Sequence, residues 1–206
     1  MDEQASGLHA ALLAGGAGTR FGAAKQLVRL RREPVLYELA TSAGAIAGQS
    51  VTVVLGAHAR EIAPALRQRA VSIAINRGWE EGIASSVRTA VHAAPPGSSA
   101  LLLMLADQVA VTADDLRRLH ASWKRHPVLI AAALYGGAPG LPAIFPRWAF
   151  TDLLALRGDR DPRSVLRRNI DRVVRVPMSN AGIDLDTPED LLRLASAPPE
   201  GAPGQE

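Results

Sequence analysis

The sequence predicts a doubly wound α/β fold, in which a parallel sheet carries helices on both faces. Two observations lead to this prediction: short apolar runs alternate with helix-like segments along the chain, and the first apolar run leads directly into a glycine-rich loop. The chain has 206 residues, of which 48% are hydrophobic, so one domain with one well-buried core is expected. In sheets of this kind, ligands bind beyond the carboxyl ends of the strands.

The predicted strands are short apolar runs of the kind found in buried parallel strands. They cover residues 8–13, 51–55, 71–75, 100–105 and 128–133, followed by a strand-like segment at 172–176. The predicted helices cover residues 34–46, 59–68, 83–93, 112–124, 147–156, 162–168 and 188–195. A proline stands near the start of the first helix, and Thr112 with Asp115 resembles a capping box at the start of the fourth.

Composition excludes several classes of protein. The chain has no cysteine, which excludes disulfides, thiolate nucleophiles and cysteine-bound zinc. A net charge of only +3 and 4% aromatic residues argue against nucleic-acid binding, and no apolar run approaches the ~20 residues that span a membrane. The N-terminus lacks the features of a secretory signal, so a cytoplasmic protein is expected. We expect the domain to cover residues 1–196 and the Pro- and Gly-rich residues 197–206 to be disordered.

The most informative segment is the loop that follows the first strand, from Leu13 to Lys25, which contains four glycines. Glycines let backbone N–H groups approach a polyphosphate closely and permit positive φ. Arg20 and Lys25 add positive charge, one as a planar fork and one as a point charge. The pattern therefore indicates a nucleoside-triphosphate cradle. Phe21 stands where a dinucleotide fingerprint needs its third glycine, and the Gly-Lys-Ser/Thr of a Walker loop is absent.

Asp107 follows the apolar run at 100–105. A carboxylate at the end of such a strand is costly to place unless it is used or paired. Because the phosphate loop follows the first strand of the same sheet, Asp107 is expected to hold Mg²⁺ on a triphosphate. The competing interpretation, a cap for the next helix, is weakened by Thr112, which serves that start. The charged segment 157–163 is interpreted either as a solvated loop or as a phosphate-binding loop.

Four motifs in this order together resemble the MobA-like nucleotidyltransferases. They are the loop Leu13-Ala14-Gly15-Gly16…Arg20-Phe21-Gly22…Lys25, the block Asn76…Trp79…Gly82…Ser85-Ser86-Val87-Arg88, the strand end Leu105-Ala106-Asp107-Gln108, and Asp184-Leu185-Asp186-Thr187-Pro188. The block around Trp79 resembles the molybdenum-cofactor cytidylyltransferase (MocA-like) branch. The resemblance covers roughly residues 8–195. It implies a three-layer α/β/α domain with a Rossmann-like, mostly parallel sheet of the nucleotidyltransferase (GT-A-like) type.

The resemblance also implies an activity. It is the Mg²⁺-dependent transfer of CMP from CTP to the terminal phosphate of molybdopterin or the molybdenum cofactor, with release of pyrophosphate. Positioning and charge neutralisation carry most of such a reaction, which fits a chain that offers cations and carboxylates but no nucleophile–base pair. A molybdenum hydroxylase of the xanthine dehydrogenase family is an implied partner, whereas nucleic acid and membrane are not.

The same resemblance assigns roles to individual residues. Lys25 and Arg20 are the implied catalytic residues, with Lys25 neutralising phosphate charge in the transition state. The implied Mg²⁺ ligands are Asp107 and Asp186, and Asp184 is a weaker candidate for the second position. The implied nucleotide-binding residues are Leu13, Ala14, Gly15, Gly16, Gly18, Arg20, Lys25, Ser85, Ser86 and Arg88.

The chain departs from the family pattern in ways that leave alternatives open. Gly15-Gly16 is closer to the guanylyltransferase form of the first loop, whereas Ala24 replaces the Asp that this form usually has before the lysine. Leu141 and the segment 158–162 differ from the family on the presumed acceptor side. The alternatives are guanylyl transfer from GTP, nucleotidyl transfer to a sugar or polyol phosphate, and a non-catalytic cofactor-binding maturation partner of a molybdenum hydroxylase.

Overall fold

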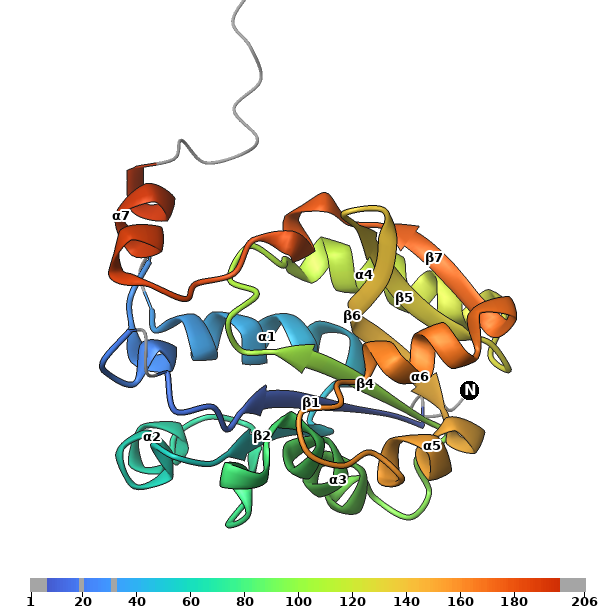
Figure 1. Cartoon of the computed structure of the whole chain (residues 1–206), viewed down its shortest axis with the longest axis horizontal. Helices are drawn as coiled ribbons and strands as arrows, with labels where there is room; N and C mark the ends of the chain where they lie inside the picture. The colour runs from blue at the N-terminus through green and yellow to red at the C-terminus, as the bar shows by residue number, and fades with distance from the viewer. Residues whose placement is uncertain (1–6, 19–20, 31–32, 197–206) are drawn as a thin grey trace, which may run out of the picture.

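The structure is a computed structural model that describes residues 7–18, 21–30 and 33–196. Arg20 and the predicted tail at 197–206 lie outside the described residues. The strands of the sheet are β1 (Leu8–Ala14), β2 (Val51–Leu55), β3 (Ser72–Ile75), β4 (Ala100–Leu105), β5 (Ile130–Tyr135), β6 (Ala138–Pro146) and β7 (Val173–Pro177). They form one sheet in the order β3-β2-β1-β4-β6-β5-β7 (Figure 1).

The sheet is mixed but mostly parallel, as the sequence predicts. β1 pairs in parallel with β2 and β4, β2 with β3, and β5 with β7. β6 alone among these strands runs against its neighbours β4 and β5. The sequence did not predict β6, because Pro139, Gly140 and Pro142 interrupt its apolar pattern and such residues are poor strand formers.

Helices cover both faces of the sheet and make a three-layer domain. α1 (Val35–Ala47), α2 (Ala59–Leu66) and α4 (Ala113–Arg125) pack on one face, and α3 (Ile83–Ala93), α5 (Phe150–Leu154) and α6 (Arg163–Arg168) pack on the other. A last helix, α7 (Pro188–Ser196), follows the sheet. The short 3₁₀ segments are η1 (Lys25–Leu27), η2 (Trp79–Glu81), η3 (Arg147–Ala149), η4 (Ile170–Arg172) and η5 (Ser179–Gly182).

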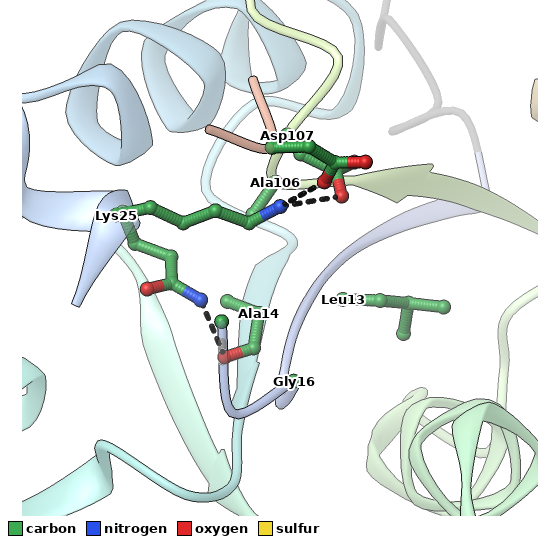
Figure 2. Close-up of a pocket in the computed structure, with 9 residues that line it drawn as sticks. Leu13, Ala14, Gly16, Lys25, Ala106 and Asp107 are labelled. Carbon is green, nitrogen blue, oxygen red and sulfur yellow. Dashed lines mark hydrogen bonds and ion pairs between the residues drawn. The ribbon is translucent and has the colours of Figure 1, made fainter. Parts of the chain in front are cut away.

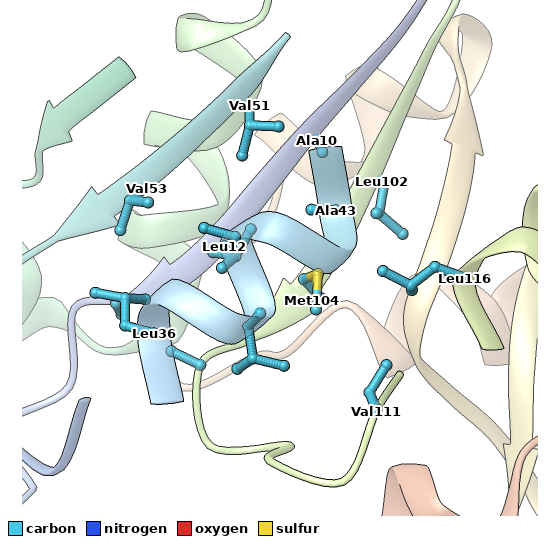
Figure 3. Packing of buried hydrophobic residues seen from close by; sticks show 14 of the residues in the cluster. Ala10, Leu12, Leu36, Ala43, Val51, Val53, Leu102, Met104, Val111 and Leu116 are labelled. Carbon is cyan, nitrogen blue, oxygen red and sulfur yellow. The ribbon is translucent and has the colours of Figure 1, made fainter. Parts of the chain in front are cut away.

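β1 shows how the apolar pattern builds both cores. Every residue of β1 is buried, and alternate side chains point to opposite faces. Leu12 belongs to the core under α1, where it packs near Leu36 and Met104 (Figure 3), whereas Leu13 belongs to the core under α3. A strand buried on both faces reads as a continuous apolar run, which is why the sequence predicts this strand so well.

The helix boundaries follow local chemistry. Thr112 caps α4 in a complete capping box, because its hydroxyl accepts from Asp115 N and the Asp115 carboxylate accepts from Thr112 N. The helix predicted at 147–156 is shorter than expected and divides into η3 and α5. Within the described part of the chain, no helix is long and apolar enough to cross a membrane.

The topology brings two strand ends together. β1 and β4 are adjacent and parallel, with Leu13 opposite Leu105. The glycine-rich loop after β1 and Asp107 after β4 therefore lie at the same carboxyl edge of the sheet, where ligands of such sheets bind.

Candidate active site

A pocket of about 180 Å³ opens at this edge. It is formed by the end of β1, the glycine-rich loop, η1, the end of β4 and the segment before α7 (Figure 2). Its lining residues are Leu13, Ala14, Gly16, Gly18, Lys25, Gln26, Ala106, Asp107 and Asp186. Among the described lining residues, one lysine and two aspartates carry charge.

The glycine-rich loop is held by close backbone approach. A Cβ on Gly56 would lie 2.3 Å from the Gly15 carbonyl oxygen, and a Cβ on Gly15 would lie 2.7 Å from Ser86 Oγ. Ala57 N donates to Gly15 O at 3.2 Å, and His58 Nε2 lies 2.8 Å from Ala17 O. The segment after β2 therefore fixes the course of the loop, and Gly56 is required because a Cβ there would overlap the backbone of Gly15.

Lys25 lies at the start of η1 and points into the pocket. Its Nζ donates to Asp107 Oδ2 at 3.0 Å and to Asp186 Oδ1 at 2.8 Å. Figure 2 shows the Lys25 side chain reaching across to Asp107. Burial alone lowers the pKa of Lys25, but the two carboxylates outweigh this and raise it. Lys25 is therefore a fixed cation at any physiological pH.

Asp107 and Asp186 are brought together by backbone hydrogen bonds. Ala106 N donates to Leu13 O at 3.1 Å and ties the end of β4 to β1. Leu185 N donates to Asp107 O at 2.9 Å and draws the carboxyl-terminal segment to the end of β4. These bonds place two acids that are distant in sequence on either side of Lys25.

Asp190 holds the segment that carries Asp186. Its Oδ2 accepts from Asp186 N at 3.1 Å and from Thr187 N at 2.9 Å, and Asp190 N donates to Thr187 Oγ1 at 3.2 Å. These hydrogen bonds lower the pKa of Asp190. The start of α7 is thus capped, and the same cap fixes the backbone of Asp186.

The carboxyl group of Asp184 interacts electrostatically with the other two acids. Although its side chain is exposed, desolvation by the surrounding protein and the negative charges of Asp107 and Asp186 raise the pKa of Asp184 to about 6. Lys25 and Arg163 oppose this rise only in part. The site therefore concentrates three carboxylates around one lysine.

The residues fit a hard divalent cation. Asp107 Oδ1 is buried and has no hydrogen-bond partner among the described residues, so it has a lone pair to offer. Within the described ranges, no group of three or more His, Cys, Asp or Glu side chains is arranged to hold a metal by itself. Mg²⁺ is usually bound by one or two carboxylates together with substrate phosphates and water. Asp107 and Asp186 would offer such a pair of carboxylates.

The structure brings only part of the predicted site together. Leu13, Ala14, Gly16, Gly18, Lys25, Asp107 and Asp186 line the pocket, and Gly15 stands between two of these residues in the sequence but is not part of the lining. Ser85 and Ser86 are buried at the start of α3, where Asn76 Nδ2 donates to their hydroxyls at 2.7 and 3.0 Å. Their predicted contact with nucleotide stays a prediction.

Arg88 and Arg20 are the two predicted arginines. Arg88 is not among the pocket-lining residues, because its guanidinium donates to the Glu81 carboxylate and to Leu156 O. Its predicted contact with nucleotide also stays a prediction. Arg20 lies outside the described residues, so its role remains as the sequence predicts it.

Two residues that sequence reasoning missed also shape the site. Gln108 is fully buried, and its Nε2 donates to Leu141 O at 2.6 Å and to Ala181 O at 2.7 Å. It thereby joins the end of β4 to β6 and η5. Tyr135, at the end of β5, accepts from Arg163 Nη2 at 2.9 Å. The sequence does contain a signal for Gln108, because it is a polar residue directly after Asp107 at the end of a buried strand. No local pattern marks Tyr135.

This fold and site define a nucleotidyltransferase-type α/β domain. The family model for the MobA-like NTP transferase domain matches residues 10–173, and the chain belongs to this family. A search of curated protein sequences found no match.

Solved structures with the same fold come from several sources. The chain is similar to a homologue of Rv0371c from Mycobacterium sp. strain JC1, with 28% identity, a TM-score of 0.78, and coverage of 93% of this chain and 96% of that one. Rv0371c from Mycobacterium tuberculosis H37Rv, also solved as a complex with manganese, gives 26% identity and a TM-score of 0.81 over 94% and 100% of the two chains. Molybdopterin-guanine dinucleotide biosynthesis protein A from Archaeoglobus fulgidus gives 18% identity and a TM-score of 0.68 over 91% and 96%, which shows the shared fold.

Proposed function

We propose that this protein transfers CMP from CTP to the terminal phosphate of molybdopterin or the molybdenum cofactor and releases pyrophosphate. The observation that carries the proposal is the convergence of Lys25, Asp107 and Asp186 beside the glycine-rich loop, with Lys25 Nζ within 3.0 Å of both carboxylates. Family membership supports nucleotidyl transfer, and the block around Trp79 supports the cytidylyl branch.

The roles of the residues follow from the charges of the reaction. An oxygen of the acceptor phosphate attacks the α-phosphorus in line, and pyrophosphate leaves with the bonding electrons. The loop N–H groups and Arg20 hold the triphosphate, and Lys25 neutralises the phosphoryl oxygens as charge redistributes. Ser85, Ser86 and Arg88 belong to the proposed nucleotide side.

Asp107 and Asp186 are the proposed Mg²⁺ ligands. When bound, the cation supplies charge neutralisation on the triphosphate. That Rv0371c was solved as a complex with manganese supports a divalent cation as cofactor, and the unpartnered Asp107 Oδ1 supports Asp107 as a ligand. A molybdenum hydroxylase is the proposed recipient of the product.

One assay tests the proposal and its alternatives. Purified protein is incubated with Mg²⁺ and each NTP in turn, with molybdopterin, a sugar phosphate or a polyol phosphate as acceptor. Pyrophosphate release and the mass of the product are measured, and the Asp107→Ala variant serves as the inactive control.

We expect pyrophosphate release with CTP and molybdopterin, and a kcat/KM for CTP above that for GTP. A clear preference for GTP overturns the nucleotide assignment but leaves the reaction type standing. Turnover with sugar or polyol phosphates alone overturns the acceptor. If the protein binds nucleotide but shows no turnover with any acceptor, the result favours the alternative of a non-catalytic maturation partner of a molybdenum hydroxylase.

A further inference from the structure

A second cation flanks the carboxylates on the side away from the glycine-rich loop. In the sheet, β1 with its loop lies next to β4, and β6 and β5 follow beyond β4. Tyr135 ends β5 at the same carboxyl edge, and Arg163 begins α6 and contacts Tyr135. Asp184 interacts electrostatically with Lys25 and Asp107 on one side and with Arg163 on the other, and so connects Arg163 to the carboxylates of the pocket.

Tyr135 is held in place from several directions. A Cβ on Gly140 would lie 2.5 Å from Tyr135 Oη, and a Cβ on Gly182 would lie 3.1 Å from its Cδ2, so backbone from β6 and η5 closes on the ring. Gln108 Nε2 donates to Tyr135 Oη at 3.4 Å. Tyr135 is therefore a rigid support that is linked to the residue after Asp107.

Arg163 is fixed on this support and keeps donors to spare. Its Nη2 donates to Tyr135 Oη at 2.9 Å, and its guanidinium carbon lies 5.7 Å from the ring centroid. The described residues supply this half-buried guanidinium with one hydrogen bond, although it carries five N–H donors. Asp161 and Asp184 interact with it electrostatically.

The charges of the proposed reaction indicate what the Arg163 guanidinium can do. An acceptor phosphate must approach a triphosphate, and the two anions repel each other. Lys25 is engaged with Asp107 and Asp186 and faces the nucleotide loop. A planar guanidinium on the opposite flank matches the bidentate geometry of a phosphate group.

We propose that Arg163, positioned by Tyr135, binds the phosphate of the acceptor and makes the site specific for acceptors that end in a phosphomonoester. This inference rests on the proposed nucleotidyl transfer to a phosphate and names the residue that recognises the acceptor. Arg163 touches the substrate in this proposal, and Tyr135 is a positioning residue.

The first test is kinetic and uses Arg163→Met with Arg160→Met as the matched control. Arg160 lies in the same charged segment, is exposed, and is not part of the proposed machinery. We expect Arg163→Met to raise the KM for molybdopterin at least tenfold and to change the KM for the nucleotide less than twofold. Arg163→Lys should fall between wild type and Arg163→Met, because a lysine keeps the charge but loses the fork.

The second test reads phosphate binding without turnover. Protein saturated with Mg²⁺ and α,β-methylene-CTP, which fills the nucleotide side, is titrated with inorganic phosphate by calorimetry. Wild type and Arg160→Met should bind phosphate alike, and Arg163→Met should bind it at least tenfold more weakly. Tyr135→Phe, which removes only the hydroxyl, should weaken phosphate binding less than Arg163→Met.

Unchanged acceptor KM and unchanged phosphate affinity in a folded Arg163→Met overturn the proposal. A parallel rise of both KM values also overturns it, because it assigns Arg163 a general structural role. If wild type transfers nothing to molybdopterin but loses phosphate binding on Arg163→Met, the proposed acceptor is wrong while the phosphate site stands.

Discussion

The two flanks of the site are built in different ways. The proposed nucleotide flank consists of one loop and the ends of two adjacent parallel strands, held by backbone contacts such as Ala106 N to Leu13 O. The proposed acceptor flank is assembled from β5, β6, η5 and α6, and side chains such as Tyr135 and Gln108 hold it together. The part proposed for phosphoryl chemistry therefore depends on local backbone contacts. The part proposed for acceptor choice depends instead on side chains that are distant in sequence and can vary separately.

The largest expected effect comes from breaking the nucleotide flank at Asp107. Asp107→Ala removes a proposed Mg²⁺ ligand and leaves triphosphate charge uncompensated. Since such a cation is worth several kcal/mol in the transition state, kcat should fall by about 10³-fold or more. Pyrophosphate release measures the loss.

Asp114→Ala, in an exposed pair with Arg117 on α4, is the matched control and should behave like wild type. Near-wild-type turnover of Asp107→Ala would remove Asp107 from the metal site.

The next effect separates chemistry from binding on the same flank. Lys25→Ala should lower kcat by about 10²-fold with little change in the KM for nucleotide, because a fixed cation acts most strongly where charge develops. Lys124→Ala, at the exposed end of α4, controls for loss of a lysine. A raised KM with unchanged kcat would instead make Lys25 a uniform binding residue.

Lys25 also stands between two carboxylates that are proposed to hold metal, and this allows a measurement without turnover. Without nucleotide, a free cation must displace an ammonium that donates to Asp107 and Asp186. Lys25→Ala should therefore bind free Mn²⁺ about tenfold more tightly or better, as followed by electron paramagnetic resonance. Equal or weaker binding in the variant would mean that these carboxylates are not the cation site of the free protein.

Sequence reasoning captures the nucleotide flank because its signals are local. Glycines directly after a buried strand and Asp107 directly after another strand are read from short stretches, and the parallel topology then places them together. Asp186 required the family resemblance, since tertiary contacts such as the hydrogen bond from Leu185 N to Asp107 O bring it near Asp107. β6 escaped prediction because its prolines and glycine mask its apolar pattern.

The acceptor flank could not be predicted in the same way. Tyr135 and Arg163 meet only after β5 and α6 have packed, and nothing near either residue marks the contact. For the charged segment 157–163, the sequence left both a solvated loop and a phosphate-binding loop open. Tertiary contacts, not local pattern, single out Arg163 within it.

Gln108 links the two flanks, and its removal tests whether they are separable. Gln108→Ala leaves the carbonyls of Leu141 and Ala181 without their buried donor, which should lower the free energy of unfolding by about 1–3 kcal/mol. Denaturant titration measures this change. If the flanks are separable, the KM for the acceptor rises while the KM for nucleotide does not. A larger effect on nucleotide would show that the flanks act as one unit.

The smallest effect concerns Asp184, which lies between the flanks. Its pKa is raised to about 6 from 3.8, so the folded state favours the protonated carboxyl. The resulting stabilisation is complete below pH ~4 and is lost as the pH rises through about 6, because the ionised carboxylate then faces Asp107 and Asp186. Asp184→Asn cannot ionise and should escape this loss.

The Asp184→Asn variant should therefore melt about 1–3 °C above wild type at pH 7.5, a small difference because the side chain is exposed and screened. Below pH ~4 the two Tm values should converge, since both side chains are then neutral. Circular dichroism melts at several pH values give the comparison. A lower Tm for the variant at pH 7.5 would mean that the pairing of Asp184 with Arg163 outweighs its repulsion from the other acids, and Asp184 would then belong to the acceptor flank.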